Sequence, residues 1–491
     1  MKLLFLFALM FAAMVSLAIA GRRGPRIALG ITGLAFLAGL TGCILPYADQ
    51  IVYGFQLGHM TCLLTTVVCF ISLVIQAYAL RHFGGDRRQS LITARLVALT
   101  MALLLFVSAD HLLLFVLGLG LSNELLVQLM VHQSRWEAAR RSGGIARWHL
   151  GVAFMALLLA SGLTYWTQGH WSLNALVQGW RATPLTPLIA TLLVVAALAQ
   201  SANLPFHRWL IASANAPTPV SAFMHAGLVN GGAIILYKWY PLLAQLSWTG
   251  TVLTVIGAAT ALVGTTWMLV QSDVKRTLTC STMGQMGFMI MQCGLGLFPA
   301  AIAHMIWHGF FKASLFLSAG STIKAAKNQS LRLQGTYALP TFAFGLVIGL
   351  AGTWIFWQFT HHTGSLGSTY LFLLFFCGIT CAHAVMTILQ PNPTLGRAAV
   401  AATLGMLGSV VYGISVWAVE QQLMVLEAQP LAYWHLAILV LFVVGWLLMI
   451  FRAYLPGAPT DRWLAPLYIR ALRNSQPPAR TLTTQRGDYS L

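Results

Sequence analysis

The chain has 491 residues, of which 58% are hydrophobic and 8% are charged, and its mean hydropathy is +0.77. A soluble domain needs far more charge to cover its surface, so this composition excludes a soluble globular protein and indicates an integral membrane protein. The seven cysteines form no CxxC pair and no zinc spacing, and we expect them to be small core residues.

The formal net charge of +18 would also be compatible with nucleic-acid binding. The basic residues, however, lie in short loops between apolar runs. Lysine and arginine accumulate in the cytoplasmic loops of membrane proteins. We therefore expect the charge to reflect contact with a lipid bilayer and expect no nucleic acid as a partner.

The first apolar run ends in Ala18, Ile19 and Ala20, which resembles a signal-peptide cleavage site. A signal peptide has its positive charge before the apolar run, whereas here Arg22, Arg23 and Arg26 follow it. This order favours a retained first helix with its N-terminus outside.

Apolar runs of about 20 residues recur along the chain, and this length is what a helix needs to cross a membrane. They predict an all-α polytopic protein with about fifteen transmembrane helices, in a membrane domain 1–453 with a basic tail 454–491. The runs lie near 1–20, 27–47, 59–80, 91–109, 111–132, 148–167, 184–211, 217–239, 249–271, 277–297, 300–323, 338–358, 369–389, 399–419 and 431–451.

Every second loop is basic. These loops contain Arg81, Arg87, Arg88, Arg135, Arg140, Arg141, Arg147, Lys275, Arg276, Lys324, Lys327, Arg332 and Arg397. The opposite loops contain Arg181 and the acidic residues Asp49, Asp110, Glu420 and Glu427. The asymmetry predicts that the basic loops and the C-terminal tail are cytoplasmic. The tail also contains apolar residues near Trp463 and Tyr468, which are typical of an interfacial amphipathic helix or a docking site as well as of a plain basic tail.

Prolines interrupt the seventh apolar run and the start of the eighth. Pro205 lies within 184–211, and Pro217 and Pro219 follow. Proline removes a backbone donor, and lipid cannot satisfy the carbonyl groups that it frees, so the broken helix must be buried in protein or line a wet cavity. Broken helices often mark ion sites in transporters, although a simple kink between packed helices would have the same sequence.

The clearest candidate for moving charge is Lys312, in the middle of the run AHMIWHGFFKASLFL. His304, His308 and Lys312 are spaced i, i+4 and i+8 and therefore share one helix face. Histidine titrates near neutrality and burial favours neutral lysine, so such a stripe can pass protons. The alternatives are three core polar residues bonded to neighbouring helices, or a zinc site, for which no third ligand is nearby.

Three further residues are candidates for ion translocation. Glu124 lies within the apolar run 111–132, His225 follows the two prolines, and Lys275 follows Asp273 at a helix end. Each also has an ordinary structural interpretation, as a hydrogen-bonded core acid, a core histidine and an interfacial ion pair. We expect Lys238 and Asp110, near the outer interface, to be snorkelling or solvated.

Two stretches carry a family resemblance. AQSANLPFHRWLIASANAPTPVSAFMHAG (199–227) resembles the broken-helix signature of the antiporter-like subunits of complex I and of Mrp antiporters. SDVKRTLTCSTMGQMGFM (272–289) and AHMIWHGFFKASLFLSAGS (303–321) resemble the segments that follow it. The resemblance implies two inverted five-helix repeats, each with a broken helix. It also implies that His225, Lys275, His304, His308 and Lys312 occupy proton-path positions.

The chain also departs from that family. Gln200 occupies the place of the family's lysine in the first broken helix, and the family's glutamate on the fifth helix falls at Leu117, with Glu124 two turns further on. No lysine follows Lys327, and His361 and His362 are weak substitutes for a lysine in the second broken helix. A neutral glutamine cannot accept and release a proton, which argues against a pump with two complete channels.

The run HAGLVNGGAIIL (225–236) is similar to the membrane subunits of DAB-type inorganic-carbon uptake complexes. That resemblance implies a bacterial inner-membrane subunit that conducts protons or sodium ions. It implies a large cytoplasmic zinc-binding partner that is similar to carbonic anhydrase, and no cofactor or catalytic centre in this chain. The alternative is a subunit of a cation/proton antiporter or the pumping arm of a complex I-like oxidoreductase.

Overall fold

The computed structural model describes residues 2–44, 50–326, 338–361, 364–365, 367–390, 393–423, 428–451, 460–478 and 481, and most of them are helical. The chain divides into two compact units. The first comprises Met1–Met291, Met305–Gly320 and Ala471–Leu491, and the second comprises Gln292–His304 and Ser321–Arg470. The predicted domain division between 453 and 454 stays a prediction, because residues 452–459 lie outside the described residues.

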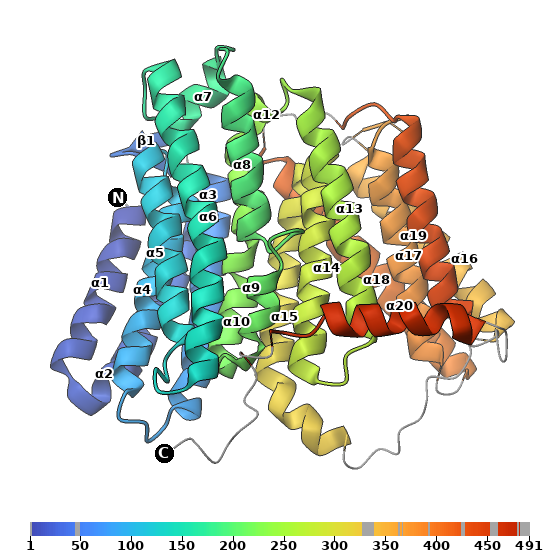
Figure 1. Ribbon diagram of the computed structural model, residues 1–491, viewed down its shortest axis with the longest axis horizontal. Coiled ribbons are helices and arrows are strands. Elements are labelled where there is room, and N and C mark those ends of the chain that lie inside the picture. Colours follow the sequence, from blue (N-terminus) through green and yellow to red (C-terminus); the bar gives the residue numbers. More distant parts are fainter. Residues whose placement is uncertain are drawn as a thin grey trace. The chain divides into compact units, whose positions relative to one another are not determined.

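The first unit is built from helices that run side by side and a short hairpin (Figure 1). Its elements are α1 (Lys2–Ile19), η1 (Gly21–Arg23), α2 (Gly24–Ile44), β1 (Gln50–Val52), β2 (Phe55–Leu57), α3 (His59–His82), α4 (Gln89–Ser108), α5 (Leu112–Met130), α6 (Glu137–Gln168), α7 (Leu173–Gly179), α8 (Thr186–Gln200), α9 (Arg208–Ala212), η2 (Ser213–Asn215), α10 (Thr218–Ala226), η3 (Leu228–Asn230), α11 (Gly231–Lys238), α12 (Tyr240–Leu243), α13 (Ser247–Leu269) and most of α14 (Val274–Gly294). Helix α15 (Phe298–Ala326) contributes to both units.

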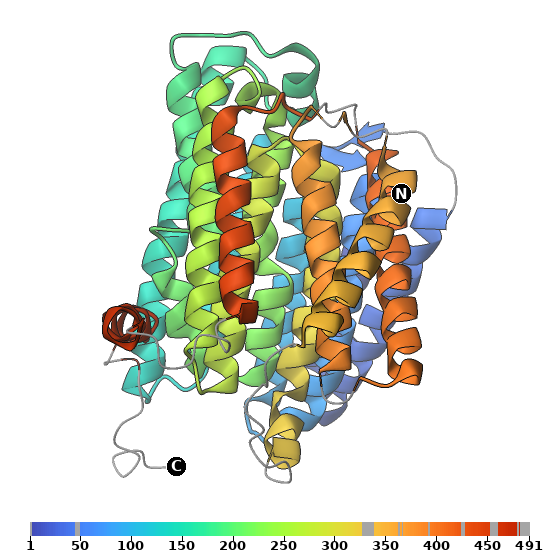
Figure 2. The same ribbon diagram turned by 90° about the vertical axis from the view of Figure 1, so that its right-hand side faces the viewer.

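The second unit contains four long helices that run side by side, α16 (Leu339–Thr360), α17 (Tyr370–Leu389), α18 (Leu395–Glu420) and α19 (Tyr433–Phe451) (Figure 2). Each is continuous over its length, so none of these four helices contains an interruption like the one between α8 and α9 (Arg208–Ala212). Helix α20 (Thr460–Asn474) runs across the direction of α19 and is seen end-on in Figure 2. Part of the tail is thus helical, with Leu467, Tyr468 and Ile469 exposed, and its interfacial or docking role stays a prediction.

Twelve helices among the described residues are long and apolar enough to cross a membrane, and α1 and α8 are shorter apolar helices. The predicted class, a polytopic all-α membrane protein, is confirmed, but the count of about fifteen crossings is not. The predicted run 184–211 is divided between α8 and α9. The run 277–297 corresponds to α14, which is not among the twelve because Lys, Arg, Thr and Ser fill its first turns.

The loops of the first unit gather at its two ends. At one end the hairpin contacts the start of α5, where the Asp110 amide donates to the Gly54 carbonyl at 2.9 Å. At the other end the α3–α4 loop contacts the α5–α6 loop, where Arg88 Nη1 donates to the His132 carbonyl at 3.0 Å. The α1–α2 turn and the α13–α14 loop lie at this second end (Figure 1), so the predicted basic loops of this unit share one end.

Lys238 and Asp110 differ from expectation, because both are buried rather than solvated. Lys238 is 8% exposed, and its amine donates to Gln56 Oε1 at 2.7 Å. Asp110 is 2% exposed and accepts from the Ser172 hydroxyl at 2.7 Å. The hairpin and α7 cover this end of the helices, and that cover removes both side chains from water.

The predicted interruption near Pro205 lies between α8 and α9, and a second one lies between α10 and α11. The two interruptions satisfy each other's backbone groups. The Ser201 hydroxyl donates to the Val229 carbonyl at 2.6 Å and accepts from the Gly232 amide at 3.2 Å. A buried interruption is stable only when its freed donors and acceptors find partners in the protein, and here they do.

Helices α13 and α14 pack closely at small residues. A Cβ atom on Gly264 would lie 2.4 Å from the Gly284 nitrogen, and one on Gly287 would lie 2.5 Å from the Ala261 nitrogen. Membrane helices often associate through such small residues because apolar area gives no driving force within lipid. This contact positions α14, which holds several residues of the candidate site.

We expect Gly264→Ala to destabilise the protein by about 1–3 kcal/mol, because the new methyl group must push the two backbones apart. The measurement is the thermal unfolding midpoint of the detergent-solubilised protein. Gly30→Ala on α2 is the control, because a Cβ atom there meets nothing within 4 Å. An equal midpoint for both variants would show that the α13–α14 contact is not close in solution.

Candidate functional site

Lys312 on α15 is the most deeply buried cation of the site, with 1% of its surface exposed. Its amine donates to the Ser281 hydroxyl at 2.8 Å and to the Leu278 carbonyl at 3.3 Å, both on α14. The two ion pairs among the described residues are Arg141–Glu137 and Arg147–Glu124, so no described carboxylate pairs with Lys312. Because neutral oxygens hold this buried amine, no unpaired carboxylate charge is left behind when the amine gives up its proton.

Lys275, at the start of α14, lies beside the interrupted segment. Its amine donates to the Ala216 carbonyl at 2.8 Å, in the turn that ends with Pro217 and leads into α10. Pro219 lies in the first turn of that helix, where a missing amide donor costs nothing. Pro217 and Pro219 therefore follow the carbonyl group that binds Lys275, whereas Pro205 lies in the earlier interruption between α8 and α9. Asp273 caps the Arg276 amide at 2.9 Å.

His225, near the end of α10, is 1% exposed and stacks on Phe316 of α15 with ring centroids 4.3 Å apart. Phe316 lies one turn after Lys312, so the His225 ring packs against the part of α15 that carries this lysine. Its Nδ1 atom has no hydrogen-bond partner among the described residues. A buried ring nitrogen without a partner, close to the turn that carries a buried lysine, is an arrangement that a proton-passing histidine can use.

His308 lies one turn before Lys312 on α15 and is 5% exposed. His304 lies one turn earlier and belongs to the second unit, where its Nδ1 atom lies 3.0 Å from Gln292 Oε1. The predicted stripe therefore exists on α15. Among the described residues no group of three or more His, Cys, Asp or Glu side chains could hold a metal ion.

Gln200 ends α8 and is completely buried. It forms two reciprocal hydrogen bonds of 3.0 Å with the amide of Asn123 on α5, and its nitrogen also reaches the Leu228 carbonyl at 3.2 Å. The position aligned with the family's lysine is thus occupied by half of a neutral amide pair. Neither amide can store a proton, so this pair holds the interrupted helices to α5 without charge.

A small cavity of about 40 Å³ lies beside this pair, lined by apolar residues and by Ser122, Gln200 and Asn230. Asn230 is 3% exposed, and its Oδ1 atom has no partner among the described residues. A cavity of this size with several polar groups can hold a water molecule.

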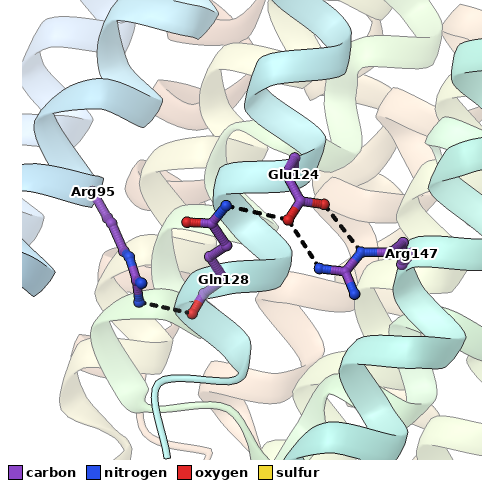
Figure 3. Close-up of polar contacts among 4 residues, drawn as sticks. All are labelled: Arg95, Glu124, Gln128 and Arg147. Carbon is purple, nitrogen blue, oxygen red and sulfur yellow. Dashed lines mark hydrogen bonds and ion pairs between the residues drawn. The ribbon is translucent and has the colours of Figure 1, made fainter. Parts of the chain in front are cut away.

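Glu124 does not join these residues. It is 44% exposed at its side chain and forms a two-bond ion pair with Arg147 of α6, at 2.9 and 3.1 Å (Figure 3). Gln128 donates to the same carboxylate at 3.2 Å. Glu124 therefore faces the outside of the α5–α6 pair, and the buried side of this turn belongs to its neighbour Asn123.

The other weak candidates were His361 and His362. His361 follows the last residue of α16 in the second unit and is exposed, and its Nδ1 atom lies 3.1 Å from the Gln358 carbonyl. His362 lies outside the described residues.

Two residues with direct contacts to the site were missed by sequence reasoning, namely Asn123, which bonds to Gln200, and Ser281, which bonds to Lys312. Asn123 and Ser281 belong to the polar clusters SNE and CST in otherwise apolar helices, and only the helical face distinguishes them from their neighbours.

Both the sequence and the structure of the chain are similar to those of known proteins. A family model matches residues 109–354, which are half of the chain, and its description is "NADH:quinone oxidoreductase/Mrp antiporter, TM". A probable inorganic carbon transporter subunit DabB from Bacillus anthracis is 34% identical over 353 residues, which cover 70% of this chain and 68% of that protein. NADH-ubiquinone oxidoreductase chain 5 from Schizophyllum commune is 34% identical over 287 residues, covering 56% of this chain and 41% of that protein.

A solved Mrp complex from Dietzia sp. has a chain with the same fold, with a TM-score of 0.61 and 22% identity. The alignment covers 97% of this chain and 52% of the Mrp chain, so this protein spans about half of its length. The matched residues 109–354 include the interrupted helices, α14 and the Lys312 stripe. The chain therefore belongs to the NADH:quinone oxidoreductase/Mrp antiporter family of membrane proteins.

Proposed function

We propose that this chain is the ion-conducting membrane subunit of an inorganic-carbon uptake complex that is driven by a cation gradient. The observation that carries the proposal is the buried Lys312 amine, bonded only to neutral oxygens among the described residues. A charge deep in a membrane protein is costly and is retained where ions move.

The order of residues along the first unit supports a path for protons. Lys275 lies at the end of the unit that holds the basic loops and bonds to the backbone just before α10. His225 lies on α10 and stacks on Phe316, one turn from the buried Lys312 on α15. The coupling ion is a proton in this proposal, and sodium is the alternative.

The carbon substrate is proposed from the relatives named as inorganic carbon transporter subunits. In this proposal the partner is a large cytoplasmic zinc-binding subunit similar to carbonic anhydrase, which hydrates CO2 to bicarbonate. One elementary charge that moves down 100 mV releases about 2.3 kcal/mol, which is enough to bias that reaction. The zinc belongs to the partner, and this chain contributes no cofactor.

A second candidate function is a subunit of a cation/proton antiporter or of a complex I-like pump. The similarity to NADH-ubiquinone oxidoreductase chain 5 and the fold shared with the Mrp complex favour it. The neutral Asn123–Gln200 pair argues against it, because that pair removes one titratable site from the first interrupted helix.

We expect Lys312→Gln to lower cation-driven uptake of labelled inorganic carbon by about 100-fold or more per assembled complex, because a proton-transfer group is lost. Lys238→Gln is the matched control. Lys238 is also a buried lysine of the first unit, but it lies beside the hairpin, at the end opposite to the basic loops. It should keep its uptake per folded molecule. Wild-type uptake by Lys312→Gln would refute the proposed path.

The partner is tested by affinity purification of the chain from its native membrane. We expect a large zinc-containing soluble subunit to co-purify, and we expect a deletion strain to grow in elevated CO2 but not in air. Co-purification of redox subunits or of further antiporter subunits alone, with normal growth in air, would favour the second candidate function.

The proposed orientation places the basic end of the first unit in the cytoplasm of a bacterial cell, with the N-terminus outside. A membrane-impermeant maleimide added to intact cells should then label Ala182→Cys and spare Ser134→Cys, which lie in exposed loops at opposite ends. The unmodified protein measures the background from the seven native cysteines. Labelling of Ser134→Cys alone would show that the orientation is the opposite of the proposed one.

A further inference from the structure

The outer surface of the first unit has a groove between α5 and α6, separate from the Lys312 site. The groove has a volume of about 320 Å³. Its apolar part includes Leu117 and Leu121 of α5, which are 50% and 51% exposed, and Leu150 and Phe154 of α6. Gly151 lies at its edge, and a Cβ atom there would meet nothing within 4 Å.

Two tryptophans on α6 mark the level of the groove in the membrane. Trp148 is 73% exposed and Trp166 is 84% exposed, and they are 18 residues apart on one face of the helix. This separation corresponds to about 27 Å along the helix axis, close to the thickness of the hydrocarbon layer. Tryptophan prefers the two membrane interfaces, so Trp148 marks the interface at the basic end of the unit.

The end of the groove near Trp148 is polar and contains the two charged residues of its lining, Glu124 and Arg147, which form an ion pair (Figure 3). Arg95 does not line the groove, but it lies on the other side of Gln128, where its Nη1 donates to the Gln128 carbonyl at 3.3 Å. Arg147 uses Nε and Nη2 for Glu124, and no residue in the described part of the chain accepts from its Nη1.

We propose that this groove binds one anionic phospholipid, with the phosphate at Arg147 and an acyl chain along the apolar part towards the middle of the membrane. The ion pair with Glu124 holds the guanidinium group at the interface with Nη1 available for a phosphate oxygen. Arginine is well suited to phosphate, and basic pockets between helices at the cytoplasmic interface bind anionic headgroups.

The shape and charge of the groove fit a lipid better than a helix of a partner subunit. A helix with its side chains is about 10–12 Å wide, and a groove of about 320 Å³ cannot enclose it. The rest of the lining is mostly apolar, and both charged residues, with the free Nη1 of Arg147, lie at the interfacial end, which is where a phospholipid has its phosphate.

Native mass spectrometry of the purified protein, supplied with phosphatidylglycerol or phosphatidylcholine in detergent, tests the proposal. We expect the wild type to retain phosphatidylglycerol in preference to phosphatidylcholine. Gly151→Leu should lose the retained lipid, because the side chain fills the groove without a clash in the fold. Arg147→Gln should lose the preference for phosphatidylglycerol.

Gly162→Leu is the matched control, because Gly162 also lies on α6 with nothing within 4 Å of a Cβ atom but does not line the groove. It should retain lipid as the wild type does. Equal lipid retention by Gly151→Leu and Gly162→Leu would overturn the proposal, as would displacement of the lipid by inorganic phosphate alone. If Gly151→Leu instead releases a co-purified protein subunit and leaves the lipid, the groove is a subunit interface and the proposal fails.

Discussion

The structure of the first unit depends on the backbone groups that its interrupted helices leave free. Hydrocarbon offers them no hydrogen bonds, so the protein must supply every partner. The ends of α8 and η3 do so for each other through Ser201 and Gln200, and Trp209 Nε1 donates to the Ala199 carbonyl at 3.1 Å. The Ala216 carbonyl, before α10, accepts from the Ser221 hydroxyl and also from the charged amine of Lys275. The interruption thus holds a cation against the backbone that leads into the helix of His225.

The same helices show how the chain separates a structural polar contact from a chargeable one. Asn123 and Gln200 satisfy each other completely, with two bonds of 3.0 Å, and their role needs no change of protonation. Lys312 is held by a hydroxyl and a carbonyl, which accept from the charged amine and tolerate the neutral one. Helix α14 supplies both of these oxygens, and its close glycine contact with α13 fixes where they lie. Rigid packing on one side of Lys312 therefore supports a group whose charge can change.

Sequence reasoning found the features that one helix determines by itself. The His304, His308 and Lys312 stripe follows from spacing alone, and the break near Pro205 follows from the missing amide donor. It could not find features that depend on which helix lies opposite. Glu124 and Asn123 are adjacent in the same apolar run, and only the packing of α5 shows that the asparagine faces the interrupted helix and the glutamate faces outward. Asp110 and Lys238 lie at helix ends, where exposure is the usual outcome, but the hairpin and α7 bury both. The count of about fifteen crossings stays a prediction, because apolar content does not show whether a short helix such as α8 is a crossing of its own.

The neutral Asn123–Gln200 pair also limits what the proposed function can require. If the first interrupted helix stores no proton at Gln200, the proposed path has one fully buried chargeable lysine, Lys312, rather than two. One charge that falls through 100 mV releases about 2.3 kcal/mol, which shifts an equilibrium constant by about 50-fold at room temperature. A pump that works against a gradient would need the second site, whereas a subunit that spends a gradient to favour hydration of CO2 needs only one downhill charge. The neutral Asn123–Gln200 pair is therefore compatible with the uptake function, and it weighs against a pump with two equivalent channels.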